Sequence, residues 1–542
     1  MAEHPIDYIE AIADAFPERP ALVFRAQRGQ DLRLSYGELD ERLNRAARVL
    51  QGLGIGPGDH VGCHMYDTPA HADVMLAAWK IGAVPINVNF RYQGSELLYL
   101  FDNADLKVVV SEPDLVELAR DAGKGLPGLD HVIAAGEEWE QCLAQASPER
   151  PAIERTGDEL YMLYTGGTTG MPKGVMWRLQ DIMHAAMGTA ANEALQVPAA
   201  ATPAAVLEHI RQEIPILMQL SSRCCFLPLM HAGGQWAMCQ GLIRGGVTVL
   251  LPDKHFDPAF ALRVMAEEKI NIAMGAGDAH ARPLLDAITA EHDGVLELPN
   301  LILWVTGAVM ISPAIKDELL AALPNTFIYD ALGASESGGQ GVAAGYSEEG
   351  SPRFMLDEGH LIVDEAMQPI DKSERRIGKL CKTGHIPLGY YKDEKKTAET
   401  FPVIDGVRYS IPGDLARWEE DGSATLFGRG SVSINTGGEK VFPEEVEKAL
   451  KSHPAIFDAV VVGTPDARFG NKVTAVVSLR PGSDNPGLDT LSGHCKQMLA
   501  GYKAPRELVV QDSIVRSPSG KPDYRWAAEV AQHELEARVS AE

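Results

Sequence analysis

The chain has 542 residues, and because one hydrophobic core stops growing at roughly 250 to 300 residues, this length predicts at least two domains. With 49 Lys and Arg against 75 Asp and Glu, the formal charge of −26 excludes binding of nucleic acid or of an anionic membrane through bulk charge. Seven cysteines without Cys-x-x-Cys spacing, and no apolar run of about 18 residues, exclude a zinc or disulfide framework and an integral membrane segment.

The first hundred residues alternate between helical and strand patterns. Apolar residues recur at helical spacing over residues 6–16, and a short apolar run at residues 21–24 predicts a strand. Ser35 and Glu38 form a capping box, which predicts that the next helix begins there. Strand and helix patterns then alternate as far as residue 110. This rhythm predicts a parallel sheet flanked by helices.

A loop rich in glycine and threonine follows the strand predicted at residues 160–164. The loop residues suited to phosphate are Thr165, Gly166, Gly167, Thr168, Thr169, Gly170 and Lys173. Glycines let backbone N–H groups approach a phosphate, hydroxyls add donors, and a lysine adds a flexible cation. A Walker A loop is excluded, because Lys173 follows Pro172 and precedes Gly174. The composition of the loop allows a polyphosphate site or a turn without a ligand.

The string YTGGTTGMPKG at residues 164–174 closely resembles the phosphate loop of the adenylate-forming superfamily. That superfamily holds acyl-CoA synthetases, the adenylation domains of peptide synthetases and beetle luciferases. The resemblance implies an α/β fold, with a large N-terminal domain of helix-flanked, mostly parallel sheets and a smaller, mobile α+β C-terminal domain. It also implies the use of ATP, Mg2+ and coenzyme A.

The next segments are interpreted as the acyl side of the site. Residues 188–213 are rich in alanine and interrupted by prolines, and we interpret them as an insertion or lid. A strand is then predicted to end at a histidine and two glycines. A histidine without an evident carboxylate or metal partner does not by itself indicate catalysis. The family has a Pro-Leu-x-His-x-x-Gly segment here, so the resemblance implies that His231, Gly234 and Trp236 position the acyl substrate.

Two later strand ends carry the residues expected at the nucleotide. The strand predicted at residues 301–305 runs into Gly307 and Ala308, which match a family turn that lies against adenine and the acyl group. The strand predicted at residues 326–329 runs into a turn of small residues with one acid, Glu336. Hard oxygen ligands suit Mg2+, so Glu336 is our candidate metal ligand and catalytic residue, although the residues alone also allow a solvated loop glutamate. The resemblance also places at the nucleotide Asp330, Ala331, Leu332, Gly333 and Ser335.

This turn departs from the family pattern at two positions. The family usually has tyrosine at the position of Leu332, with its ring packed on adenine, and threonine at the position of Ser335. Serine retains the hydroxyl, whereas leucine can bury the purine face without offering an aromatic one. The first change therefore weakens the expectation for nucleotide affinity or base selectivity.

The match resumes at the junction of the two predicted domains. Asp414 stands where the family accepts hydrogen bonds from both ribose hydroxyls, and Arg429 carries over as a ribose or phosphate contact. We divide the chain into residues 1–428, which bind ATP and acid, and residues 429–542, which form the mobile domain. The family usually has an aspartate hinge after this arginine, and Val432 takes its place, so we expect Gly430 to absorb much of the rotation.

The second predicted domain carries one glycine turn and one lysine of interest. Gly437 and Gly438 match the turn that forms part of the CoA tunnel in the family. Strands at residues 460–462 and 473–479 and a helix at residues 491–499 predict a small α+β unit. Near the end, a Pro-Ser-Gly-Lys context implies that Lys521 is the catalytic lysine that contacts the carboxylate and the α-phosphate.

These motifs stand in family order and predict an ATP-dependent acid–thiol ligase of the acyl-CoA synthetase type. Thr165 and Lys173 would position phosphates, Glu336 would act through Mg2+, and Lys521 would act at the reacting centre, so catalysis is mainly positioning and charge stabilisation. Three alternatives stay open at this point: an enzyme that loads a carrier protein, a luciferase-like oxygenase, and an inactive nucleotide-binding homologue.

The expected partners are small molecules in the cytoplasm. They are a carboxylic acid, ATP and CoA; no nucleic acid is expected, and the sequence allows a homodimer. We expect a medium to long or bulky acid, such as the carboxylated side chain of a steroid, because Gly233, Gly234 and Gly307 leave room in a pocket and an extended apolar segment precedes Cys224.

Overall fold

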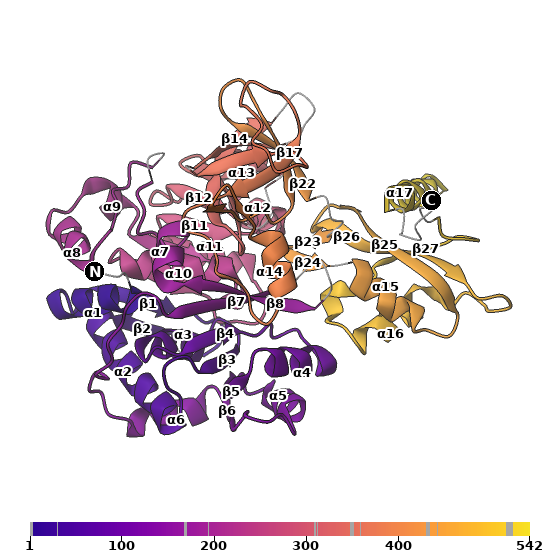
Figure 1. Cartoon of the computed structure of the whole chain (residues 1–542). Coiled ribbons are helices and arrows are strands. Elements are labelled where there is room, and N and C mark those ends of the chain that lie inside the picture. Colours follow the sequence, from indigo (N-terminus) through magenta and orange to yellow (C-terminus); the bar gives the residue numbers. More distant parts are fainter. Residues whose placement is uncertain are drawn as a thin grey trace. The chain divides into compact units, whose positions relative to one another are not determined.

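The computed structural model describes residues 4–29, 31–166, 171–192, 195–307, 311, 313–346, 352–357, 359–429, 434–441, 443–515 and 524–541. Contacts divide the chain into two compact units. The first unit contains Met1–Phe90, Phe101–Thr165 and Gly174–Gly428. The second unit contains Arg91–Leu100, Gly166–Lys173 and Arg429–Glu542. Figure 1 shows the elements of each unit.

The larger sheet has a parallel middle with antiparallel strands at its sides. Its strands, in order across the sheet, are β16 (His360–Val363), β17 (Gly378–Lys382), β21 (Asp414–Trp418), β22 (Ala424–Arg429), β15 (Pro352–Leu356), β14 (Gly338–Tyr346), β13 (Phe327–Ala334), β12 (Leu303–Thr306), β11 (Ile272–Gly275), β9 (Ser222–Cys225), β10 (Val247–Leu250), β1 (Pro20–Phe24) and β2 (Leu32–Ser35). The run from β13 to β1 is parallel. Antiparallel pairs flank this run: β2 pairs with β1, β14 with β13, and β15 with β14.

A second sheet carries the strands that flank the predicted phosphate loop. Its strands, in order, are β18 (Gly389–Tyr390), β8 (Pro172–Arg178), β7 (Leu160–Gly166), β4 (Val84–Asn87), β3 (His60–His64), β5 (Leu106–Ser111) and β6 (His131–Ala134). Strands β3 to β7 pair in parallel, as the alternating pattern predicted. A small hairpin, β19 (Val403–Ile404) with β20 (Val407–Arg408), stands apart from both sheets.

Helices connect these strands, as a parallel sheet requires. Up to residue 400 they are α1 (Pro5–Ala15), α2 (Tyr36–Gly52), α3 (Pro69–Lys80), α4 (Gly94–Asn103), α5 (Val116–Gly123), α6 (Glu137–Gln145), α7 (Leu179–Ala185), α8 (Pro203–Arg211), α9 (Pro215–Gln219), α10 (Ala232–Ile243), α11 (Pro258–Glu267), α12 (Gly277–His292), α13 (Pro313–Ala322) and α14 (Glu394–Thr400). The capping box at α2 is present: Glu38 N donates to Ser35 Oγ at 3.2 Å and Ser35 N donates to Glu38 Oε2 at 2.8 Å.

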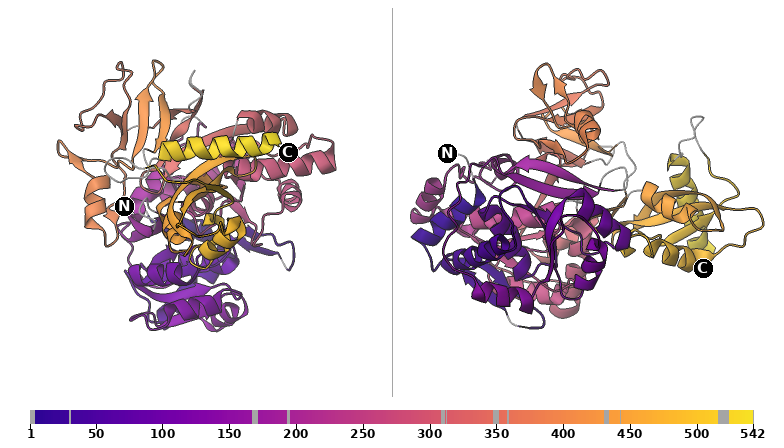
Figure 2. Two further views of the ribbon diagram at one scale, coloured as in Figure 1. Left: turned by 90° about the vertical axis from the view of Figure 1, so that its right-hand side faces the viewer. Right: turned by 60° about the horizontal axis from the view of Figure 1, so that its bottom comes forward.

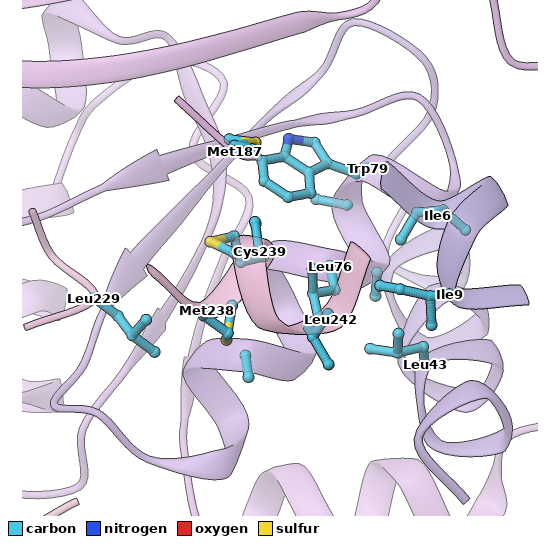
Figure 3. Close-up of a cluster of buried hydrophobic side chains, with 14 of the residues drawn as sticks. Ile6, Ile9, Leu43, Leu76, Trp79, Met187, Leu229, Met238, Cys239 and Leu242 are labelled. Atoms are coloured by element: carbon cyan, nitrogen blue, oxygen red, sulfur yellow. The ribbon is translucent and has the colours of Figure 1, made fainter. Parts of the chain in front are cut away.

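The core of the first unit gathers helices that lie far apart in the sequence. Figure 3 shows Ile6 and Ile9 of α1 beside Leu43 of α2 and Leu242 of α10. All four side chains are at most 1% exposed, so the helical stripe predicted near the N-terminus is a core face. Burying side chains of this size contributes roughly 1.5–3 kcal/mol each.

Part of the segment that we expected to be a lid is packed into this core instead. Ala200 is fully buried, and Tyr8 Oη donates to its carbonyl at 2.8 Å. Val206 of α8 is 1% exposed. The guanidinium of Arg244 donates to the carbonyls of Pro198 and Ala190 at 2.9 and 2.8 Å. These long-range contacts fix the segment against α1 and α10, and the lid interpretation is wrong.

The second unit is a small α+β structure. Its sheet contains β24 (Glu439–Val441), β23 (Ile434–Thr436), β26 (Gly470–Leu479), β25 (Ile456–Asp466) and β27 (Glu507–Val510). Its helices are α15 (Pro443–Lys451), α16 (Gly487–Lys496), the 3-10 turn Gly501–Lys503 and α17 (Tyr524–Ala541). Figure 2 shows α17 beside the strands of this unit, and Ala527 and Ala531 share a buried cluster with Val460.

Candidate functional site

A buried asparagine lies at the end of a strand next to the predicted phosphate loop. Thr165 and Gly166 close β7, and Lys173 lies at the start of the neighbouring β8 (Figure 1). Asn87 ends β4 and is 5% exposed. Its Nδ2 donates to the carbonyls of Tyr164 at 2.9 Å and Met230 at 2.7 Å, and its Oδ1 accepts from Tyr164 N at 2.7 Å. One side-chain amide therefore joins the end of β7 to the residue before His231.

Several expected site residues lie outside the described residues. They are Gly167, Thr168, Thr169, Gly170, Ala308, Gly430, Val432 and Lys521. Their roles stay predictions from the resemblance. The phosphate loop is therefore described at its two strands, Leu160–Gly166 and Pro172–Arg178.

His231 lies in a turn that we call the acyl-side turn, residues 227–234. It is the N-cap of α10 and is half-buried. Leu229 N in this turn donates to Asp67 Oδ1 at 2.7 Å. Gln235 Nε2 donates to the Leu229 carbonyl at 2.8 Å. Burial raises the pKa of Asp67 to about 7, although the bond from Leu229 and the nearby His231 both lower it.

The glycines of the acyl-side turn serve packing, which corrects our expectation of open space. A Cβ on Gly234 would lie 2.4 Å from the Pro228 carbonyl oxygen and 2.5 Å from that of Leu227. A Cβ on Gly233 would lie 2.9 Å from Leu227 Cδ1. Only glycine permits α10 to approach the preceding backbone this closely. Among the three glycines that we expected to leave room, Gly307 alone has no atom of the described residues within 4 Å of an added Cβ.

Gly307 follows strand β12, beside an acid that the resemblance placed at the nucleotide. Gly307 N donates to the Gly275 carbonyl at 3.1 Å, so the turn continues the edge formed by β11 and β12. Asp330 is 2% exposed; its Oδ1 accepts from Thr306 Oγ1 at 2.6 Å and its Oδ2 from Lys316 Nζ at 2.8 Å. These contacts tie the acid to neighbouring elements, and its role at the nucleotide stays a prediction.

The turn that contains Glu336 differs from its predicted form. Strand β13 does not end at Tyr329 but continues to Ala334, where it pairs antiparallel with Gly338 of β14. Leu332 and Gly333 are thus strand residues, and Leu332 packs beside Phe354. The continuation follows from β14, which supplies an antiparallel partner that the small residues after Tyr329 did not suggest.

We call residues 335–339 the Glu336 turn, and side chains from three other segments hold it. Trp177 Nε1, from β8, donates to the Ser335 carbonyl at 2.9 Å. Tyr390 Oη, from β18, donates to Glu336 Oε1 at 3.2 Å. Ser410 Oγ donates to the Glu336 carbonyl at 2.5 Å. Glu336 is 8% exposed, and the bond from Tyr390 of the second sheet orients its carboxylate.

The remaining expected contacts lie on strand ends and on one glycine turn. Asp414 begins β21, and Arg429 ends β22. Gly437 and Gly438 form the turn between β23 and β24, with φ of 59° and 86°, which glycine adopts at low cost. A Cβ on Gly437 would lie 2.8 Å from the ring of Phe469, so this turn also packs closely.

The strand order and the Glu336 turn can be compared with known proteins. The profile of the AMP-binding enzyme family matches residues 9–391, and that of the AMP-binding enzyme C-terminal domain matches residues 445–521. The chain belongs to the AMP-binding enzyme family. The resemblance identified from the phosphate loop is thereby confirmed.

Relatives of this AMP-binding enzyme match over nearly the whole chain. A 3-oxocholest-4-en-26-oate–CoA ligase from Rhodococcus rhodochrous is 42% identical over 97% of this chain and 96% of its own. A medium/long-chain-fatty-acid–CoA/3-oxocholest-4-en-26-oate–CoA ligase from Mycobacterium marinum is 43% identical over 98% of this chain and 95% of its own. The expected class of acid–thiol ligases is the class to which these relatives are assigned by name.

Solved structures support the fold. An amide bond synthetase from Marinactinospora thermotolerans has a TM-score of 0.76 and 22% identity, and the match covers 96% of this chain and 99% of that one. The α/β fold with a large N-terminal and a smaller C-terminal domain is confirmed. Within the described part of the chain, no helix is long and apolar enough to cross a membrane.

Sequence reasoning missed the side chains that hold the two turns of this AMP-binding enzyme. Asn87, Asp67, Trp177 and Tyr390 come from strands or turns that showed no motif. Asn87 carried a weak signal, because a polar residue ended an apolar strand pattern. The aromatic donors carried none, since a Trp or Tyr in a strand is usually core packing.

Proposed function

We propose that the chain is an ATP-dependent acyl-CoA synthetase. A carboxylate oxygen of the acid attacks the α-phosphorus of ATP, the bond to pyrophosphate breaks, and an acyl adenylate forms. The sulfur of CoA then bonds to the acyl carbon, AMP leaves, and the thiol proton is released. The observation that carries this proposal is the 42–43% identity to CoA ligases over at least 95% of both chains.

The substrate is a medium- or long-chain fatty acid or a steroid with a carboxylated side chain. The names of the relatives support this class. We expected Gly233 and Gly234 to leave room for a bulky acid, but backbone and side-chain atoms fill the space beside both glycines. These two residues therefore do not support the substrate class. Free CoA as the acceptor is favoured over a carrier protein or oxygen, because both relatives are named CoA ligases.

Glu336 fits a magnesium ion that ATP brings with it. It is a buried carboxylate with one oxygen bonded to Tyr390. Among the described residues no group of three His, Cys, Asp or Glu could hold a metal by itself. Mg2+ commonly takes one or two carboxylates and completes its shell with phosphate oxygens and water. When bound, the ion would neutralise charge on the phosphates, and Glu336 would hold it.

The other residues position the two substrates. Thr165 and Lys173, with the loop between them, bind phosphates; Asp414 accepts from the ribose hydroxyls, and Arg429 contacts ribose or phosphate. Gly307 lies between adenine and the acyl group, His231 and Trp236 border the acyl group, and Gly437 and Gly438 border CoA. Lys521 supplies positive charge where the carboxylate meets the α-phosphate.

The test is ATP–pyrophosphate exchange with a panel of acids from acetate to a steroid carboxylate. We expect exchange with medium, long or ring-bearing acids and thioester on addition of CoA. Faster turnover of acetate or propionate than of every longer acid would contradict the substrate class. Lys521→Ala should abolish exchange but spare thioester formation from supplied acyl adenylate, because its charge is needed when the carboxylate and phosphate react.

Compartment and assembly belong to the same proposal. The reducing cytoplasm is supported by seven cysteines that are all free, six of them buried. A homodimer is proposed as the assembly, and sedimentation of the purified protein tests it directly.

A further inference from the structure

A buried lysine also holds the Glu336 turn. Lys382 ends β17 and is 8% exposed. Its ammonium donates to the Ser337 carbonyl at 2.9 Å and to the Gly339 carbonyl. Both acceptors are backbone carbonyls of the Glu336 turn, one and three residues after Glu336, so the contact acts on the path of the turn and not on the carboxylate itself.

Lys382 and Ser410 work as one support. Lys382 N donates to the Ser410 carbonyl at 3.0 Å, and Ser410 N donates to the Lys382 carbonyl at 2.7 Å. The two side chains leave this one backbone bridge toward the Glu336 turn. The Ser410 hydroxyl donates to the Glu336 carbonyl, and the Lys382 ammonium donates to the carbonyls of Ser337 and Gly339. Asp414 begins its strand four residues after Ser410. The bridge therefore joins the segment of the proposed ribose acceptor to the segment of the proposed metal ligand.

We propose that Lys382, together with Ser410, is a positioning residue that fixes Glu336 relative to Asp414 for adenylate formation. This inference rests on the proposed function. Residues that orient a metal ligand commonly matter nearly as much as the ligand. Lys382 touches neither ATP nor acid in this role; it sets where the Glu336 carboxylate stands.

The cost of burying this cation shows that it is not an ordinary core side chain. Burial lowers the pKa of Lys382 to about 8. Asp357 is the acid whose charge opposes that change. Burial lowers the pKa of His360 and of His184, and the charge of Lys382 adds a smaller effect in the same direction. Core packing alone would be served better by an apolar residue, because a buried charge is costly unless it is used.

The variants that test the proposal are Lys382→Met and Ser410→Ala, with Lys379→Met as the control. Methionine retains the length of the side chain and removes the donors. Lys379 lies on the same strand at a half-buried position. The readouts are kcat of ATP–pyrophosphate exchange, the Mg2+ concentration at half-maximal rate, and KM for the acid, with thermal unfolding as a check of the fold.

For Lys382→Met we expect a loss of about 10-fold or more in kcat and a several-fold higher Mg2+ requirement, with KM for the acid unchanged. Ser410→Ala should shift the same two quantities, and it carries the test where Lys382→Met does not fold. Lys379→Met should match the wild type. In a double-mutant cycle, adding Lys382→Met to Glu336→Gln should cost nothing further, because Lys382 acts through Glu336.

Two results would overturn the inference: an unchanged Mg2+ requirement in both variants, or losses that simply add to that of Glu336→Gln. Those results would leave the proposed function intact, since the wild type would still exchange pyrophosphate. Failure of the proposed function is a separate outcome, in which the wild type exchanges pyrophosphate with no acid of the panel.

Discussion

The Glu336 turn and the acyl-side turn lie in the same unit and are held in opposite ways. At the Glu336 turn, Trp177, Ser410 and Lys382 donate hydrogen bonds to backbone carbonyls. At the acyl-side turn, the carboxylate of Asp67 accepts from a backbone N–H, and Gly234 lets α10 pack on the turn. One turn is held by a buried cation that donates, the other by a half-buried carboxylate that accepts.

Because of this difference, the supports of the two turns change their charge at different pH values. Burial lowers the pKa of Lys382 to about 8 and raises the pKa of Asp67 to about 7. Lys382 is charged below about pH 8 and Asp67 above about pH 7, so both are charged at once only between these two values. Alkali therefore acts first on the Glu336 turn, and acid acts first on the acyl-side turn. Four changes sharpen or break this comparison.

The largest effect is expected from the proposed metal ligand. Glu336→Gln keeps the shape of the side chain and removes its charge, so the rate of ATP–pyrophosphate exchange should fall by roughly 10² to 10³-fold, as for other groups that stabilise developing charge. Glu365→Gln, an exposed carboxylate, is the control. A loss of less than threefold in Glu336→Gln would remove Glu336 from the chemistry.

The close packing of the acyl-side turn is tested by Gly234→Ala. The new Cβ meets two backbone carbonyl oxygens that cannot move independently, so the free energy of unfolding should fall by about 1–3 kcal/mol. Gly233→Ala meets only the flexible end of Leu227 and should cost less. Chemical denaturation measures both, and equal losses would contradict the packing role of Gly234.

Asp67→Asn tests the half-buried carboxylate of the acyl-side turn. The pKa of Asp67 in the folded chain lies above its ordinary value of 3.8, so the folded state binds more protons and stability is lost as the pH rises from about 4 through 7. Asparagine cannot ionise and can still accept from Leu229. The variant should therefore gain on the order of 1–2 kcal/mol over the wild type at pH 8 and not at pH 4.

A constant difference in unfolding free energy between Asp67→Asn and the wild type at both pH values would show that Asp67 does not titrate in this range. The measurement is equilibrium unfolding at pH 4, 6 and 8 in one denaturant.

The smallest effect is expected from Tyr390→Phe. The change removes the bond to Glu336 Oε1 and retains the buried ring, so exchange should slow by roughly 2- to 10-fold. Tyr391→Phe removes a comparable hydroxyl that bonds Asp105, on the surface, and is the matched control. Equal activity of both variants would mean that the other supports hold Glu336 without Tyr390.

Local signals in the sequence were enough for the order of the elements as far as residue 110. The capping box of Ser35 and Glu38 is formed by neighbours in the chain, and the parallel strands β3, β4 and β5 are short apolar runs that are buried almost throughout. The phosphate-loop string was long enough to identify the family. These features depend on residues within one turn or one strand of each other, which is why they could be predicted.

The supports of the site could not be predicted in this way. Lys382 lies 43 residues from Gly339, and Asn87 lies 143 residues from Met230, so no local pattern pairs them. Gly234 could be interpreted as open space or as close packing, and only the position of the Leu227 and Pro228 carbonyls decides between them. The strand extension to Ala334 likewise depends on β14.

The most direct test of the central claim follows both products of one reaction. The purified chain is incubated with ATP, Mg2+, CoA and a long-chain or steroid carboxylic acid, and nucleotide and thioester are separated and quantified. The account predicts one AMP for each acyl-CoA, and acyl adenylate with pyrophosphate when CoA is left out. Release of ADP in place of AMP, or thioester formation without any acyl adenylate, would contradict it.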